Sequence, residues 1–407
     1  MLRQNYPVRL IRVLLSIIIL ISTVPANAAT SDPGGKSCNK AGLKTTYKNF
    51  TYQCKKSGNK LIWVKGAKVI TTPVATYLYS KDAKAGALCR VNGQESFPMS
   101  GPLRCVSGKW INVDRSQDSV ATRAFRSVLE KYNANPPAKL TFKFLADPKF
   151  TGSIEILMAS KEAAARLWNK PDTPFQPYPI VIGSNLDWIK KTTAANNLKT
   201  NTGDFKNIEN QISEWQGCSY AEFYSQTSQP WYVYCYSQPE AEMRESIAYL
   251  QVGAHEYTHL IQFYMADNTL KRFGDSLPPW IQEGFAMFVG ISLGAAAKAG
   301  NDIRALELAI LPTVKTPLSD YIEQFPPNWN DVYVLGYLAS EALIALKGIN
   351  IMEEIILEQK NGSSKEAAIQ KTTGKSLKFW TQIGQGYVDS VKAGKPWSLA
   401  ELEKRAS

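Results

Sequence analysis

From about residue 119 onward, the spacing of apolar and polar positions predicts a mixture of helices and strands. Segments in which apolar residues recur every three or four positions are typical of amphipathic helices, and short apolar or alternating runs are typical of strands. Helices and strands mixed in this way indicate an α+β domain, which we place at residues 119–395. The predicted helices are 119–132 and 160–168, and the predicted strands are 139–147, 178–184 and 231–237.

Two of these elements carry a more specific prediction. Ser160 stands where its side chain can cap helix 160–168, because a serine oxygen accepts a backbone N–H of the first helical turn. Residues 231–237 are predicted to form an edge strand, with which an extended peptide could pair.

The longest helical pattern spans residues 237–265. Ser237 can cap its start, Pro239 fits its first turn, and apolar residues then recur at helical spacing as far as Tyr264. We interpret this apolar stripe as core. A second helix is predicted at residues 278–290, where two prolines precede an apolar face.

The N-terminal residues predict a secretory signal peptide. Arg3, Arg9 and Arg12 precede an apolar run at residues 13–24, and Ala26-Asn27-Ala28 completes a small-x-small cleavage pattern. The run is shorter than the roughly 20 apolar residues that a transmembrane helix needs. We therefore predict removal of residues 1–28, no transmembrane anchor in the mature chain, and a secreted or cell-envelope-associated protein.

Six cysteines form three local pairs, separated by 16, 16 and 17 residues. An even number in an exported chain predicts disulfides, and sequential pairing is the simplest of the fifteen possible connectivities. The segments around the first two pairs also form an internal repeat, with Cys-x-x-x-Gly, a second Cys, and then Gly, Lys and Trp. We predict two small disulfide-stapled β modules, at residues 29–70 and 80–115. The expected pairs are Cys38 with Cys54, Cys89 with Cys105, and Cys218 with Cys235.

The formal net charge is +12, and +9 remains once the three signal arginines are removed. A soluble basic surface is the simpler interpretation, and the two modules are then only a spacer. The functional alternative is that the basic charge attracts the chain to an anionic cell wall or membrane surface, with the two modules binding the cell envelope, its anionic polymers or carbohydrate. No nucleic-acid recognition motif occurs, and export separates the chain from most nucleic acid, so we expect no nucleic-acid partner.

Both histidines of the chain lie in one short segment, residues 253–260, with the sequence GAHEYTHL. On a helix, residues four apart lie on the same face, so His255 and His259 can bind one metal ion. Glu256 is turned by about 100° from His255, where its carboxylate can reach a water molecule on the metal without binding the metal itself. This His-Glu-x-x-His pattern predicts a zinc (Zn2+) site with Glu256 as the general base on zinc-bound water.

A catalytic zinc site usually has a third protein ligand. No further histidine exists and the cysteines are expected to be oxidised, which leaves an aspartate or a glutamate. Glu283 lies among apolar residues on the predicted helix 278–290, where a buried carboxylate requires a partner. We predict Glu283 as the third ligand.

The segments HEYTH (255–259) and WIQEGFA (280–286) together resemble the motifs of the gluzincin zinc metallopeptidases. This peptidase-MA-like group includes aminopeptidase N-like and thermolysin-like enzymes. The resemblance implies a small mixed sheet, an active-site helix and a mainly helical C-terminal part. It also implies two histidine ligands, a later glutamate ligand and a glutamate that activates water. Residues 333–350 and 367–391 are similar to the later helices of such domains.

The chain also departs from this family. Twenty-three residues separate His259 from Glu283, more than in aminopeptidase N-like enzymes, and the Gly-x-Met-x-Asn motif of that group is absent. Aminopeptidase activity is therefore not supported, and we expect an endopeptidase acting on protein or peptide substrates. Met287 stands where thermolysin-like enzymes carry an aspartate, so the sequence does not identify the hydrogen-bond partner of the histidines.

The oxyanion formed during peptide hydrolysis needs a donor besides zinc. The resemblance implies a tyrosine hydroxyl, and Tyr333 and Tyr337 are the candidates, with Tyr333 preferred. The leading prediction is thus a secreted zinc metallopeptidase. The alternative hypothesis is a cell-envelope-binding protein whose peptidase-like domain is non-catalytic.

Overall fold

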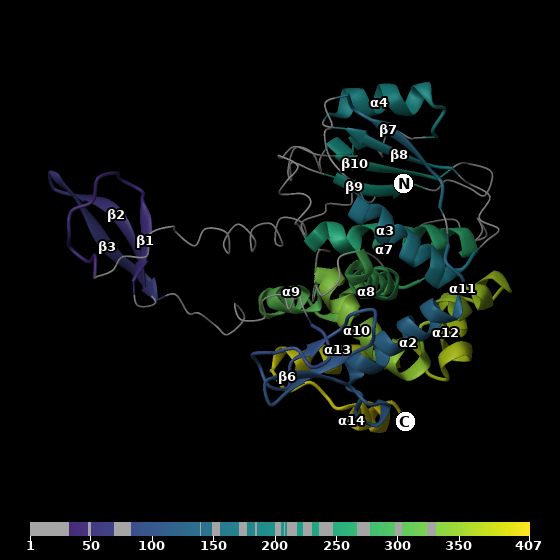
Figure 1. The fold of residues 1–407 in the computed structure, drawn as a ribbon. Coiled ribbons are helices and arrows are strands. Elements are labelled where there is room, and N and C mark those ends of the chain that lie inside the picture. The colour runs from purple at the N-terminus through teal and green to yellow at the C-terminus, as the bar shows by residue number, and fades with distance from the viewer. Residues whose placement is uncertain are drawn as a thin grey trace. The chain divides into compact units, whose positions relative to one another are not determined.

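The structure is a computed structural model in which helices combine with three small sheets, consistent with the predicted α+β class (Figure 1). The predicted signal peptide lies outside the described residues. By their internal contacts the described residues fall into two compact units, one that ends before residue 79 and one that extends from there to residue 407. The structure describes residues 32–47, 50–68, 83–138, 140–148, 155–170, 177–183, 185–199, 205–206, 208–209, 218–222, 230–235, 247–266, 277–297, 303–323 and 331–407.

The first unit is an antiparallel sheet of three strands in the order β1-β2-β3. The disulfide between Cys38 and Cys54 is present, with an S–S distance of 2.00 Å. It fastens the segment before the sheet to β2, and Cys54 stands opposite Trp63 in the strand register. The strands are β1 (Lys44–Tyr47), β2 (Phe50–Ser57) and β3 (Lys60–Lys68).

The second module repeats this design, which confirms the internal repeat. Cys89 is bonded to Cys105, and Cys105 stands opposite Trp110. The backbone N–H of Gly42 donates to the carbonyl of Cys54, and that of Gly93 donates in the same way to Cys105. The strands are β4 (Glu95–Ser96), β5 (Leu103–Val106) and β6 (Lys109–Asn112).

The second module packs against helix α2 (Val120–Ala134) within the larger unit. Arg126 of α2 donates to the carbonyl of Val113 over 2.9 Å. The rings of Phe97 and Phe125 lie 5.3 Å apart. Helix α2 confirms the predicted helix 119–132, and Ser119 caps it by accepting the backbone N–H of Thr122.

The larger unit contains a four-stranded mixed sheet with the strand order β7-β8-β10-β9 (Figure 1). The first three strands are parallel and β9 is antiparallel to β10. Val181 and Val233 face a core cluster with helix α4 (Leu186–Ala195) on one side. On the other side Tyr178 contacts Tyr257 of helix α7 (Ile247–Ala266). The strands are β7 (Phe142–Ala146), β8 (Tyr178–Gly183), β9 (Cys218–Glu222) and β10 (Trp231–Cys235).

The prediction that residues 231–237 form an edge strand is wrong. β10 pairs with β8 on one side and with β9 on the other, and its residues from Trp231 to Tyr234 are at most 2% exposed. A strand buried on both faces is typical of the interior of a sheet. In the register of this pair Cys218 stands opposite Cys235. The predicted disulfide between them depends on side chains outside the described part of the chain.

The predicted cap at Ser160 is also wrong. Helix α3 (Glu155–Trp168) begins five residues earlier, and Ser160 is fully buried inside it. The preceding residues, with the sequence EILMA, include strong helix formers that extend the helix past the expected cap.

Helices make up the remainder, around α8 (Pro279–Ala297), whose described side chains are buried on every face. α7 (Ile247–Ala266) confirms the helix predicted at residues 237–265 as far as it is described. Within the described residues no single helix combines the length and apolar composition of a membrane span, and the one pair that does so together, α10 with α11, bends by 89°. The other helices are α9 (Ile303–Ile310), α10 (Asp331–Lys347), α11 (Ile351–Lys360), α12 (Lys365–Thr373), α13 (Leu377–Lys392) and α14 (Leu399–Ala406).

Candidate metal centre

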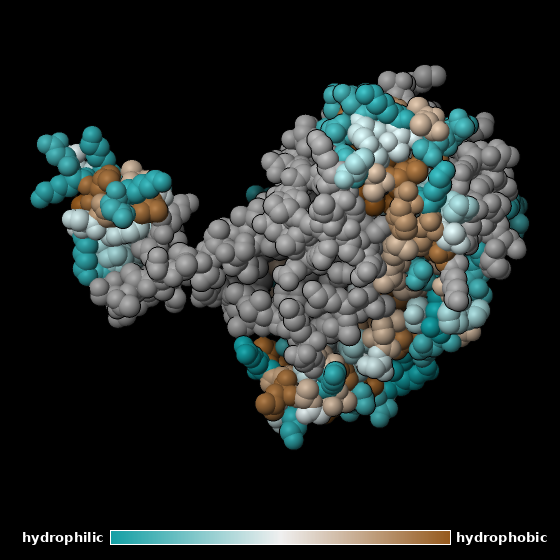
Figure 2. All heavy atoms as spheres, turned by 45° about the horizontal axis from the view of Figure 1, so that its top comes forward, coloured by the Kyte–Doolittle hydropathy of each residue, from teal (hydrophilic) through white to brown (hydrophobic). Residues whose placement is uncertain are grey.

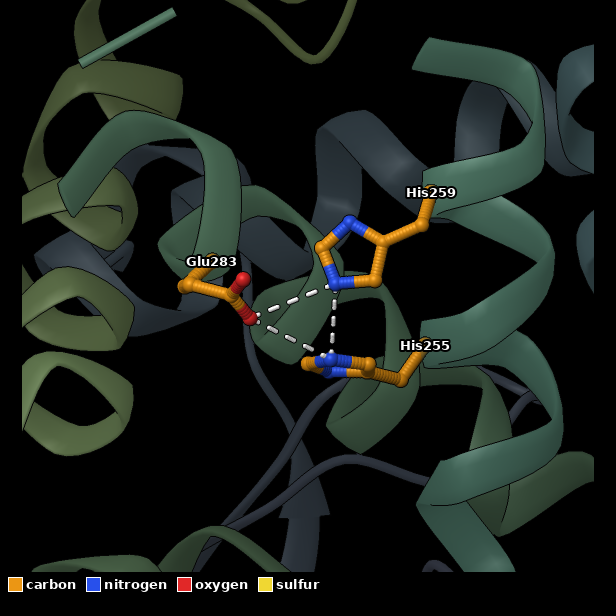
Figure 3. A group of neighbouring side chains, drawn as sticks. All are labelled: His255, His259 and Glu283. Carbon is orange, nitrogen blue, oxygen red and sulfur yellow. Dashed lines mark hydrogen bonds and ion pairs between the residues drawn. The ribbon is translucent and has the colours of Figure 1, made fainter. Parts of the chain in front are cut away.

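Helix α7 brings the two histidines together. His255 and His259 are one helical turn apart, and their Nε2 atoms lie 3.0 Å from each other (Figure 3). Both side chains are buried, at 8% and 6% exposure. α7 is anchored from behind, since the indole N–H of Trp168 in α3 donates to the hydroxyl of Thr258 over 3.1 Å. The face that carries the histidines is therefore fixed by packing as well as by helix geometry.

Helix α8 supplies the carboxylate. Glu283 Oε2 lies 3.2 Å from Nε2 of His259 and 3.5 Å from Nε2 of His255, and the three side chains point toward one another (Figure 3). Two glycines of α8 permit it to pack closely against the backbones of α10 and α7. A Cβ at Gly284 would stand 2.2 Å from the carbonyl oxygen of Gly336 in α10, and one at Gly290 would stand 2.9 Å from the carbonyl oxygen of Gln251 in α7.

The separations fit a tetrahedral ion. Ligand atoms about 2.0–2.1 Å from a tetrahedral zinc ion are about 3.3 Å from each other. The three separations in the centre, 3.0, 3.2 and 3.5 Å, scatter around that value. His255, His259 and Glu283 thus form a buried group that could hold a metal ion.

Gln262 orients one of the ligands. Its side-chain N–H donates to the carbonyl of Gln282 over 3.0 Å, which turns its amide oxygen toward His259. That oxygen accepts the Nδ1–H of His259 over 2.8 Å. In a neutral imidazole with hydrogen on Nδ1, the lone pair is on Nε2 and faces the centre. The tautomer is therefore the one that a metal ligand needs.

Opposite charges dominate the metal-free centre. Burial lowers the pKa of His259, but the carboxylate of Glu283 outweighs it and raises that pKa to about 9. Burial likewise raises the pKa of Glu283, but the two histidines outweigh it and lower that pKa to about 2. A proton and a divalent cation therefore compete for the same position.

Glu256 is partly exposed, whereas its neighbours on either side are buried. It is placed beside the centre without being one of the three converging ligands. Glu256 also acts electrostatically on Lys161 of α3, whose Nζ lies 3.2 Å from the ring centroid of Tyr232. Burial lowers the pKa of Lys161 well below its ordinary value, and Glu256 acts in the opposite direction. The sequence did not point to Lys161, because a lysine in a helix usually lies on the surface.

The two candidate tyrosines lie in different surroundings. Tyr333 is partly exposed and its ring centroid lies 5.9 Å from that of His255. Tyr337 is 1% exposed and its hydroxyl donates to Glu341 Oε2 over 3.0 Å. Only Tyr333 of this pair has a ring contact with a histidine of the centre among the described contacts.

The chain matches no known protein family, no curated protein and no solved structure. The chemistry of the centre must therefore be inferred from its own residues.

Proposed function

We propose that the chain is a zinc metallopeptidase of the gluzincin type, acting as an endopeptidase on protein or peptide substrates outside the cell. The observation that carries this proposal is the convergence of His255 Nε2, His259 Nε2 and Glu283 Oε2 at 3.0–3.5 Å in a buried centre. Two imidazoles and one carboxylate favour zinc among the common divalent metals. The two disulfides of the modules are in keeping with an oxidising, extracellular environment.

Zinc bound there would polarise the scissile carbonyl group and lower the pKa of a bound water molecule to about 7. Glu256, adjacent to His255 and partly exposed, takes the proton of the attacking water and delivers it to the leaving nitrogen. Tyr333 donates its hydroxyl hydrogen to the oxyanion of the substrate. The strand that pairs with an extended substrate is then β9, one of the two edge strands of the described sheet and the one that lies against α7.

The test combines metal analysis with the substitution Glu256→Gln. The chain without residues 1–28 should purify with about one zinc per molecule and cleave internal bonds in a peptide library. Glu256→Gln should keep the zinc and lose about 10²–10⁴-fold in kcat, because a positioned general base contributes about that much. Glu403→Gln, a substitution of an exposed glutamate in α14, is the matched control and should cleave like the parent.

The same experiment distinguishes a peptidase from the alternative, a cell-envelope-binding protein with a non-catalytic domain. If the parent chain binds zinc but cleaves no peptide, or if Glu256→Gln cleaves as fast as the parent, the proposed mechanism is excluded. The first of these results would leave a zinc-binding protein of the cell envelope.

A further inference from the structure

The positive charge of the chain is concentrated in its first module. Residues 32–68 contain nine lysines, no arginine and one acidic residue, Asp32, so they carry a net charge of +8. Residues 83–407 carry only +1 of the total of +12. A uniformly basic surface does not describe this distribution, because 37 residues hold most of the excess charge of the mature chain.

Six lysines of this module are exposed, and for four of them no ion pair with an acidic side chain occurs among the described residues. The single acid is already engaged. Asp32 Oδ1 accepts the backbone N–H of Gly34 over 2.8 Å, and this bond, together with Tyr52 and nearby lysines, lowers the pKa of Asp32. These four are Lys40, Lys55, Lys56 and Lys60, whereas the other two, Lys36 and Lys65, act electrostatically on Asp32.

The lysines lie on both faces of the module's sheet. Successive side chains of a strand point to opposite faces. Cys54 is buried on one face of β2, so Lys56 lies on that face and Lys55 on the other. Lys60 stands opposite Ser57 and therefore shares the face of Lys55. In Figure 2 hydrophilic side chains of this module surround a smaller apolar patch.

We propose that the first module binds a flexible linear polyanion of the cell envelope, a polymer with phosphate or carboxylate groups along its length. Lysine ammonium groups act as point charges and bind such groups without a fixed geometry. A flexible polymer can contact both faces of the sheet at once, whereas a flat membrane can contact only one. Among the described residues of the module only Leu43 and Val64 are exposed large apolar side chains, which offers little surface for insertion into lipid.

The test measures binding of the chain without residues 1–28 to immobilised inorganic polyphosphate and poly-glutamate at several salt concentrations. The parent should bind at least one polymer, with an affinity that falls as salt rises. Substituting the four lysines by glutamine should lower the slope of log affinity against log salt by about 3, since each lysine contributes about 0.7–0.9. The two polymers distinguish phosphate from carboxylate recognition.

Two further variants control for charge and folding. Glutamine at four exposed lysines of the larger unit removes the same charge, and the slope should change by less than about 1. Arginine at the four module lysines should keep the binding. Three results would overturn the proposal. The two glutamine variants could lose polymer binding equally, or the arginine variant could lose it. The third result is a parent that binds phosphatidylglycerol vesicles but neither polymer. The control positions are Lys315, Lys378, Lys395 and Lys404.

This proposal is independent of the proposed peptidase. Cleavage of a small neutral peptide should be the same in the parent and in both glutamine variants, because none of these lysines lies near the metal centre in the sequence. Failure of polymer binding and failure of cleavage are therefore separate results.

Discussion

Two buried polar clusters lie in the helical part of the chain, and they are built in opposite ways. In the first, Glu341 of α10 accepts both arms of Arg304 over 2.7 and 2.8 Å. The hydroxyl groups of Tyr337 and Tyr387 complete it, donating over 3.0 and 2.7 Å. Burial raises the pKa of both tyrosines well above its ordinary value, so each hydroxyl keeps the hydrogen that it donates.

The candidate metal centre brings hydrogen-bond acceptors together without matching donors. With the hydrogen of His259 on Nδ1, the atoms that converge include the lone pair of His259 Nε2 and a carboxylate oxygen of Glu283. These atoms accept hydrogen bonds and do not donate them. A buried cluster of acceptors needs a cation between them, whereas a cluster with matched donors needs nothing more. The candidate metal centre is therefore completed either by a proton on His259, whose pKa is raised to about 9, or by a metal cation, whereas the first cluster is complete without either.

The largest effect should follow from removing a ligand. Glu283→Gln keeps the side-chain volume and removes the charge. Zinc affinity should fall by about 10²–10⁴-fold, because a third of a binding free energy of about 10–16 kcal/mol is lost. If zinc binds only the folded state, it should raise the Tm of the parent, and this rise should disappear in the variant. Calorimetry with and without zinc tests both statements; a variant that binds zinc like the parent would remove Glu283 from the centre.

The structural cluster should respond in stability instead. Glu341→Gln leaves Arg304, whose side chain is 17% exposed, without its counter-charge, and we expect the free energy of unfolding to fall by up to about 3–5 kcal/mol. Zinc affinity of the folded protein should change less than about twofold. Urea unfolding and zinc titration are the measurements, with Glu403→Gln as the exposed control. A large loss of zinc affinity together with unchanged stability would contradict the contrast between the two clusters.

Sequence predicted which three residues form the centre, but it did not predict the residue that orients one of them. The four-residue spacing of His255 and His259 and the apolar context of Glu283 indicated which residues meet, because helix geometry is local. Gln262 was missed because it occurs as one polar residue within an apolar stripe. Its three-residue spacing from His259 was visible, but the carbonyl of Gln282 that turns its amide comes from another helix.

The two errors in the fold have different causes. The pattern of residues 231–237 correctly indicated a strand, but its position in the sheet depends on pairing with β8 and β9, which lie elsewhere in the chain. The start of α3 was misplaced because Ser160 has the chemistry of a cap while the residues before it favour a longer helix. The local sequence pattern predicts whether a segment is a helix or a strand. The position of a strand in its sheet depends on the strands that pair with it.

The two tyrosines of α10 belong one to each cluster and allow a direct comparison. Tyr333→Phe should lower kcat by about 10²–10³-fold, as expected for loss of an oxyanion donor, with stability and zinc content unchanged. Tyr337→Phe removes one donor from Glu341 and should cost about 1–3 kcal/mol of stability with kcat unchanged. Steady-state kinetics and urea unfolding of both variants provide the measurements. The assignment of Tyr333 fails if its variant keeps the parent kcat, or if Tyr337→Phe is the one that loses it.

The smallest effect concerns the residue that orients His259. Gln262→Leu removes the acceptor for Nδ1–H, so the imidazole loses the bond that fixes its tautomer and its ring. Zinc affinity should fall about 10–100-fold, the usual effect of such a partner. Gln262→Glu keeps an oxygen at this position and should retain most of the affinity, although the bond to the Gln282 carbonyl is lost. Competition titration with a chelating dye measures both variants. If leucine and glutamate reduce the affinity equally, then packing at this position, and not acceptance of the imidazole hydrogen, supports the centre.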